Sequence, residues 1–106
     1  MIRNDDLQTG KEFKDLLQKQ VSVSEVLIYG SRARGDADPD SDLDILVVIY
    51  DEETGSREKV YDAAWETGLK RKVVISTIVV TRREITQTAL RSSPLIQSVR
   101  REGIAV

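Results

Sequence analysis

The sequence of 106 residues contains neither cysteine nor histidine. Without cysteine, disulfides, thiolate catalysis and zinc–sulfur sites are excluded, and the composition fits the reducing cytoplasm in which we expect the protein to work. Without histidine, a Ser-His-Asp triad, a histidine general base and a histidine metal site are impossible. Any chemistry must therefore use carboxylates, hydroxyls, lysine, arginine or a bound metal ion.

Long apolar runs and an excess of positive charge are also missing. No segment approaches the length of a membrane span, and we expect no signal peptide and no membrane contact. The formal net charge of −2 argues against a general nucleic-acid-binding protein, which is usually basic. With 40% apolar and 32% charged residues the chain has the composition of a soluble globule, and its length predicts a single domain at 1–106.

One segment stands out, running from Gly30 to Asp44 and reading GSRARGDADPDSDLD. An apolar run at 26–29 ends where the segment begins, and a second run at 45–49 starts where it ends. This pattern predicts a strand, a tight polar turn and a second strand. A short helix expected at 31–35 would present free N–H groups to an anion, and Gly30 has no Cβ to obstruct a phosphate.

Two carboxylates open the second predicted strand. Residues two apart in a strand face the same side, so Asp42 and Asp44 are expected to project side by side, with Leu43 turned the other way. Paired carboxylates near a turn with free N–H groups suit a divalent metal ion that carries the phosphates of a nucleotide.

Other interpretations of the acidic segment explain less of it. A solvated turn suits 36–41, because Asp, Pro and Ser favour turns for local reasons. Asp44 lies inside an apolar run, however, where an unpaired carboxylate is costly and needs a metal or a cation. A calcium loop of the EF-hand type requires glycine at position six and glutamate at position twelve, but counting from Asp36 gives Ser41 and Val47. A P-loop fails because no Gly-Lys-Ser/Thr follows the glycines.

The arrangement of Gly30-Ser31, ten residues and then Asp-x-Asp resembles the signature of the DNA polymerase beta nucleotidyltransferase superfamily. Ala33-Arg34-Gly35 and the closing Ser41-Asp-Leu-Asp-Ile45 resemble in particular the minimal nucleotidyltransferases (MNT). These small bacterial and archaeal proteins are often paired with HEPN-domain partners as toxin–antitoxin systems. The resemblance extends from Val23 to the C-terminus and is most specific in the motif itself.

The resemblance implies a nucleoside triphosphate substrate, with ATP the leading choice, and a Mg²⁺ or Mn²⁺ ion. Metal binding and catalysis would fall to Asp42 and Asp44. The phosphates would be bound by four residues at the start of the motif, namely Gly30, Ser31, Arg32 and Arg34. For the two arginines, a surface cation beside an acidic turn is an equally good interpretation.

One feature departs from the superfamily pattern. Active members carry a third carboxylate on a neighbouring strand, where it holds the catalytic metal and activates the attacking hydroxyl. The matching segment here, 72–80, contains no Asp or Glu, and Ser76 or Thr77 occupies the expected place. A neutral hydroxyl is a poor Mg²⁺ ligand and a poor base at neutral pH, so nucleotide binding is expected to survive better than transfer.

The rest of the chain predicts an α/β (α+β) fold, in which a small mixed β-sheet packs against helices, as in the nucleotidyltransferase fold. Hydrophobic spacing predicts strands at 21–29, 43–50 and 72–81, and helices at 5–20, 31–35, 57–70, 82–91 and 94–103, followed by an apolar tail at 104–106. Thr81 and Glu84 match a capping box. Trp65 is a candidate for the inner face of the third of these helices.

The leading functional hypothesis is transfer of AMP from ATP, or of another nucleoside monophosphate, onto a protein partner. The resemblance implies that this partner is a HEPN toxin modified on a tyrosine, with the present chain as antitoxin. The alternative is a non-catalytic binding module that neutralises its partner by contact, which the missing third carboxylate favours. A homo-oligomer is left open.

Overall fold

The computed structural model describes residues 1–106. Its elements are α1 (Asn4–Gln18), β1 (Val23–Tyr29), α2 (Gly30–Arg34), β2 (Leu43–Ile49), α3 (Ser56–Arg71), β3 (Ile75–Thr81), α4 (Arg82–Gln87), the 3₁₀ helix η1 (Ala89–Ser92), α5 (Pro94–Glu102) and β4 (Ile104–Ala105). The strands form one sheet in the order β3-β2-β1-β4. The α/β fold with a small mixed sheet is thus confirmed. No helix has the length and apolar character needed to cross a membrane.

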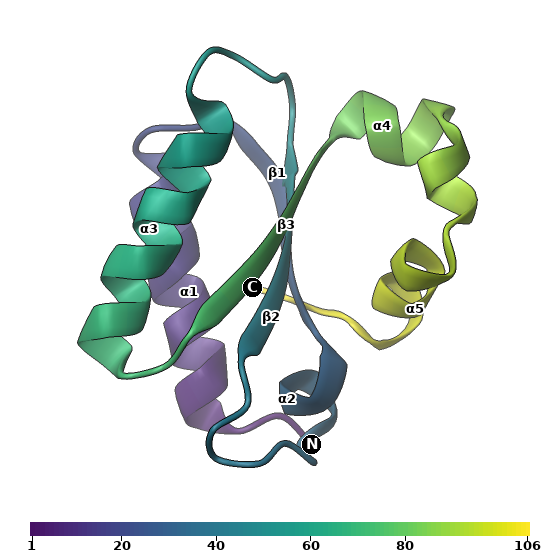
Figure 1. The fold of residues 1–106 in the computed structure, drawn as a ribbon. Helices are drawn as coiled ribbons and strands as arrows, with labels where there is room; N and C mark the ends of the chain where they lie inside the picture. The colour runs from purple at the N-terminus through teal and green to yellow at the C-terminus, as the bar shows by residue number, and fades with distance from the viewer.

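Helices cover both faces of the sheet (Figure 1). On one face, Phe13 and Leu17 of α1 and Val60 of α3 pack against the strands in the larger core cluster. On the other face, Ile85 of α4 and Ile96 of α5 close a smaller cluster. The short helix α2 lies at one end of the sheet, where β1 stops (Figure 1).

The strand β2 forms the centre of this arrangement. It pairs antiparallel with β1 and parallel with β3. Ile45 and Val47 belong to the larger core cluster and Leu46 and Val48 to the smaller one, and all four are fully buried. The continuous apolar run therefore reflects burial on both faces, as expected for a central strand.

The third strand starts later than its apolar pattern suggests, at Ile75 rather than Lys72. Lys72 ends α3 with a left-handed backbone (φ 59°), and the N–H of Val73 donates to the carbonyl of Gly68 at 3.0 Å. These residues are therefore used to close the helix before the chain can extend.

The predicted capping box is present. The hydroxyl of Thr81 accepts a hydrogen bond from the Glu84 N–H at 3.1 Å, and the Glu84 carboxylate accepts one from the Thr81 N–H at 3.0 Å. The helix that follows was expected to reach about Arg91 but ends at Gln87. Thr88 takes an extended backbone, and its hydroxyl accepts a hydrogen bond from the Leu90 N–H at the start of the separate 3₁₀ helix η1. The predicted helix is therefore divided in two at Thr88.

The expectation for Trp65 was wrong. Its side chain is 71% exposed instead of facing inward, because it lies on the side of α3 that lines an open groove with β3. The apolar tail, in which no strand was expected, forms β4: Ile104 and Ala105 pair antiparallel with Ile28 and Leu27 of β1. Helix α5 returns the chain alongside β1, and this return makes the pairing available.

Candidate functional site

The two halves of the Gly30–Asp44 segment meet at one end of the sheet. β1 ends at Tyr29, α2 begins at Gly30, and Tyr29 is the cross-strand partner of Asp44 in β2. The antiparallel pairing therefore brings the start of α2 beside the start of β2. Gly35, with φ +82°, ends α2 and turns the chain into the loop that leads back to Asp42.

Gly30 and Asp44 are in closer contact than the sequence could reveal. Gly30 has φ +75°, a backbone conformation that side chains with a Cβ rarely adopt. A Cβ added at this position would lie 2.7 Å from Oδ2 of Asp44. The Asp44 carboxylate thus lies directly against the glycine backbone, and this glycine is needed for the carboxylate as well as for any phosphate.

The side chains of Asp42, Leu43 and Asp44 alternate as expected. Leu43 is fully buried in the larger core cluster, while Asp44 is half-buried and Asp42 is exposed. Burial raises the pKa of the Asp44 carboxyl, and the neighbouring Asp42 carboxylate raises it further. The two acids are therefore close enough to repel each other.

Neither Asp42 nor Asp44 has a cationic partner. All ion pairs of the protein involve other acids, and no lysine or arginine nitrogen lies within 4.0 Å of either carboxylate. No group of three potential metal ligands is present in the protein. The two carboxylates of Asp42 and Asp44 alone fit Mg²⁺, because this ion is commonly held by one or two carboxylates, with phosphate oxygens and water completing its coordination shell.

The start of α2 offers backbone donors beside this pair. No side chain caps the helix at Tyr29, and Gly30 and Ser31 are its first two residues. The first N–H groups of a helix have no partners within the helix and attract anions. Gly30 and Ser31 are both partly exposed, so an anion can approach them from solvent.

Arg32 is occupied by its own loop. Its Nε and Nη2 donate to the carbonyl of Ser41 at 2.9 and 2.6 Å, and Nη2 also donates to the carbonyl of Pro39 at 3.0 Å. Its Nη1 donates to Asp6 in α1 at 3.0 Å, and both side chains of this ion pair are largely buried. The geometry favours a positioning role, in which Arg32 holds the loop that carries Asp42.

Arg34 has a different environment. Its guanidinium pairs with Asp36 at 3.3 Å and with Glu102 of α5 at 3.4 Å, and its side chain is 47% exposed. These contacts correspond to the surface-cation interpretation, and exposed pairs of this kind exchange readily. Arg34 can therefore leave its partners for a phosphate at far lower cost than Arg32.

The place of the third carboxylate is taken by Ser76. In the parallel pairing of β2 with β3, Ser76 is the partner of Asp44, whereas Thr77 is the partner of Ile45 and belongs to the opposite face. Ser76 is exposed. Of the two hydroxyls considered from the sequence, Ser76 is thus the one beside the acidic pair.

Sequence reasoning missed Tyr29 and Asp6. Tyr29, the last residue of β1, is the cross-strand partner of Asp44 in β2, and burial, together with the Asp44 carboxylate, raises the pKa of its hydroxyl. It ends an apolar run and so resembled an ordinary strand residue. Asp6 resembled a helix-start acid; only its buried contact with Arg32 reveals its part in the site.

Comparison with known proteins gives a consistent result. A model of the nucleotidyltransferase domain matches residues 11–104. A protein of Methanocaldococcus jannaschii, whose assigned description is protein adenylyltransferase MJ0141, is 33% identical over 72 residues, which cover 65% of this chain and 73% of that protein.

Two solved structures share the fold. A toxin–antitoxin crystallised with AMP-PNP has a TM-score of 0.61 at 20% identity, covering 97% of this chain and 72% of its own. A variant of the toxin–antitoxin MntA–HpeT, in which two aspartates two positions apart are replaced by glutamate, has a TM-score of 0.58 at 18% identity, covering 94% and 70%. At these identities the likeness establishes the fold.

Proposed function

Because this chain belongs to the nucleotidyltransferase domain family, we propose that it transfers AMP from ATP to a hydroxyl group of a protein partner. The observation that carries the proposal is the carboxylate of Asp44, placed against Gly30 and beside Asp42 with no cation on either acid. The relative described as a protein adenylyltransferase supports AMP as the transferred group and a protein as the acceptor.

Different residues of the motif would bind the metal ion and the phosphates. Asp42 and Asp44 would hold Mg²⁺ or Mn²⁺ together with phosphate oxygens of the nucleotide. When bound, this ion neutralises the charge that develops on the leaving pyrophosphate. The N–H groups of Gly30 and Ser31 would donate to phosphate oxygens, and Arg34, whose ion pairs are exposed, would add a positive charge.

The reaction is a substitution at phosphorus. The acceptor oxygen forms a bond to the α-phosphorus, and the bond from that phosphorus to the oxygen bridging to the β-phosphate breaks. Pyrophosphate leaves with the bridging oxygen, and the acceptor hydroxyl loses its proton. Ser76 is a weak base at neutral pH, so the proton passes to water or to a group of the acceptor protein, and we expect slow transfer.

The proposed acceptor is a tyrosine of a HEPN-domain toxin, with this chain acting as its antitoxin in the cytoplasm. Two proteins with the same fold are toxin–antitoxin complexes, and one of them was crystallised with AMP-PNP, an analogue of ATP. The variant of the other changes two aspartates with the spacing of Asp42 and Asp44, which supports a role for such a pair.

A second function is supported by Ser76. With no carboxylate on β3 beside Asp44, the chain could bind nucleotide and partner without turnover and neutralise the toxin by contact. The two functions differ in one measurable quantity, the covalent mass of the partner.

The test is incubation of the protein with ATP, Mg²⁺ and a purified HEPN-domain protein as the proposed partner, followed by the intact mass of that partner. A gain of one or more AMP groups supports the transferase. An unchanged mass, in a complex that still suppresses the toxin, replaces it with the contact mechanism. Omission of Mg²⁺ is the matched control.

A further inference from the structure

An exposed stripe runs along α3 on the side that lines an open groove with β3. Glu58, Tyr61, Trp65 and Leu69 share one side of the helix at spacings of three or four residues, and Lys72, which follows the end of α3, lines the same groove. Tyr61, Trp65 and Leu69 are 50%, 71% and 62% exposed. Large apolar side chains grouped in this way on a surface mark an interaction site. We call these five residues the α3 stripe.

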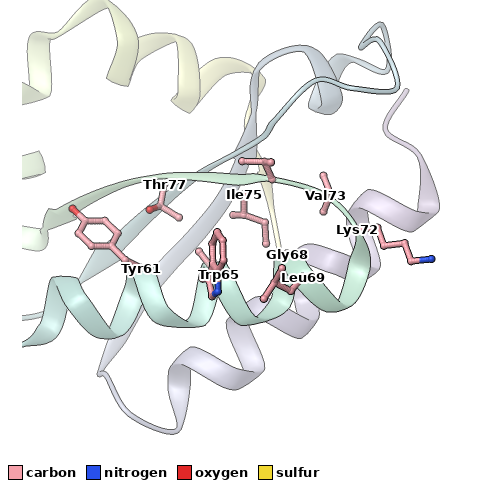
Figure 2. Close-up of a pocket in the computed structure, with 10 residues that line it drawn as sticks. Tyr61, Trp65, Gly68, Leu69, Lys72, Val73, Ile75 and Thr77 are labelled. Atoms are coloured by element: carbon pink, nitrogen blue, oxygen red, sulfur yellow. The ribbon is translucent and has the colours of Figure 1, made fainter.

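The α3 stripe borders a groove of about 540 Å³ between α3 and β3. Figure 2 shows Tyr61 and Trp65 extending from α3 toward β3, where Thr77 and Ile75 lie. Val74, 65% exposed, adds apolar surface at the same edge. The groove differs from the acidic pair in chemical character, since no carboxylate lines it.

The strand β3 is an edge strand, and the middle of its edge is unprotected. At one end, Nη1 of Arg57 donates to the carbonyl of Val79 at 2.7 Å; at the other, the N–H of Val73 is used by α3. The carbonyl of Val74 points inward, where it accepts from β2 at 2.8 Å. Because alternate residues of a strand bond to opposite sides, the backbone groups of Ile75 and Thr77 point outward.

Charge and spacing make the α3 stripe complementary to itself. Glu58 and Lys72 are each seven residues from Trp65, and Tyr61 and Leu69 are each four residues from it. A two-fold axis through Trp65 therefore places Tyr61 against Leu69 of a second copy and brings Glu58 toward its Lys72, which follows the end of the helix. Glu58 and Lys72 are exposed, and neither has an ion-pair partner within the chain.

We propose that this face binds a second copy of the chain, giving a homodimer with antiparallel α3 helices and antiparallel β3 edges. The same axis falls near Ser76, so Ile75 of each copy pairs with Thr77 of the other and extends the sheet across the dimer. The ladder cannot grow further, because Arg57 already covers Val79. So short an interface predicts a weak dimer whose population depends on concentration.

Sedimentation velocity over a wide range of concentrations tests the dimer directly. We expect a shift from the mass of one chain to that of two, with a blue shift of tryptophan emission over the same range. Trp65 is the only tryptophan, so its emission reports this face alone. Trp65→Lys should abolish the dimer, whereas Tyr50→Lys, at an aromatic residue 51% exposed elsewhere, should not.

Charge reversal tests the register. Glu58→Lys or Lys72→Glu alone should raise the dissociation constant of the dimer about tenfold or more, because like charges then meet twice across the axis. The double variant should restore the wild-type constant. Circular dichroism checks that each variant is folded.

Failure of the double variant to rescue would refute the register, and a single-chain mass at all concentrations would refute the dimer itself. A single-chain mass combined with binding of a different protein to this face would also overturn the proposal. None of these outcomes depends on AMP transfer, so the dimer and the proposed function can fail separately.

Discussion

At the scale of single residues, the position of Asp44 depends on the absence of a side chain at Gly30. The glycine allows a left-handed backbone, and it leaves room for the carboxylate that would otherwise meet a Cβ at 2.7 Å. Substitution here has two separate consequences, backbone strain and displacement of a proposed metal ligand.

Gly30→Ala should therefore weaken Mg²⁺-dependent ATP binding in addition to lowering the free energy of unfolding. The left-handed backbone alone costs roughly 1–2 kcal/mol for a residue with a Cβ. Gly55→Ala is the matched control, because Gly55 has φ +83° and nothing within 4 Å of the added Cβ. Chemical denaturation should show a similar loss of unfolding free energy for both variants, while calorimetry should show a loss of affinity for ATP in Gly30→Ala only. Equal affinities would contradict the contact with Asp44.

The acidic pair gives a second prediction. Asp42→Asn together with Asp44→Asn should abolish Mg²⁺-dependent binding of ATP, as measured by calorimetry, and leave the fold intact by circular dichroism. Asp36→Asn with Asp40→Asn is the control, since these residues belong to the exposed turn. Unchanged affinity in the first double variant would place the metal elsewhere.

The two arginines of the motif should behave differently. Arg32→Met leaves the buried carboxylate of Asp6 without its partner and should lower the free energy of unfolding by about 3–5 kcal/mol. Arg34→Met removes exposed pairs and should cost under about 1 kcal/mol. Denaturant unfolding of both variants checks this. A stable Arg32→Met protein that has lost ATP affinity would instead make Arg32 a phosphate ligand.

At the scale of elements, the pairing of β2 with β3 decides what a third carboxylate could do. Ser76→Asp would place one beside Asp44 and supply a candidate base, worth about 10²–10⁴-fold in rate where transfer is limited by proton removal. Repulsion among three acids should lower the stability of the metal-free protein. The readouts are AMP transfer and thermal unfolding, and Ser76→Asn is the uncharged control.

An equal rate in Ser76→Asp and Ser76→Asn would mean that proton removal is not limiting or that the acceptor supplies the base. Rapid AMP transfer by the wild-type protein would have the same meaning. Either result would remove the reason to regard Ser76 as a missing catalytic group.

Local patterns predicted the elements that carry the site. The apolar runs before Gly30 and after Asp44 gave both strands and the alternation around Leu43, because strand periodicity is a property of neighbouring residues. The position of Asp6 against Arg32 could not be predicted, since the two are 26 residues apart and no spacing links them. Whether Trp65 faces the core was equally inaccessible, because it depends on where the sheet ends.

The missed strand β4 has the same explanation. Ile104 and Ala105 are too few to show alternation, and their pairing with β1 exists only because α5 directs the chain back along the sheet. Partners that are distant in the sequence are fixed by the fold and leave no local signature.

At the scale of the whole molecule, the raised pKa of Asp44 links folding stability to pH. The unfolded chain releases this proton near the ordinary value of 3.8, and the folded chain at a higher pH. Between the two values the unfolded state binds fewer protons, so the metal-free protein loses stability as pH rises through this window. Asp44→Asn should abolish that loss.

Thermal unfolding without metal should therefore give similar melting temperatures for wild type and Asp44→Asn near pH 4 and a higher value for the variant at pH 7. Mg²⁺ should then raise the melting temperature of the wild type only, because a ligand of the folded state stabilises it. A difference between the proteins that does not change with pH would contradict the linkage.

The central position of β2 also has a kinetic consequence. Its backbone amides bond to strands on both sides, so they should exchange with solvent deuterium only through global unfolding. Asp44 belongs to this slowly exchanging strand, whereas Asp42 ends a loop held by the contacts of Arg32 with Pro39 and Ser41. We therefore expect the amides of this loop to exchange faster than those of β2. Asp44 is thus positioned by the most stable part of the sheet, whereas the position of Asp42 depends on a single arginine side chain.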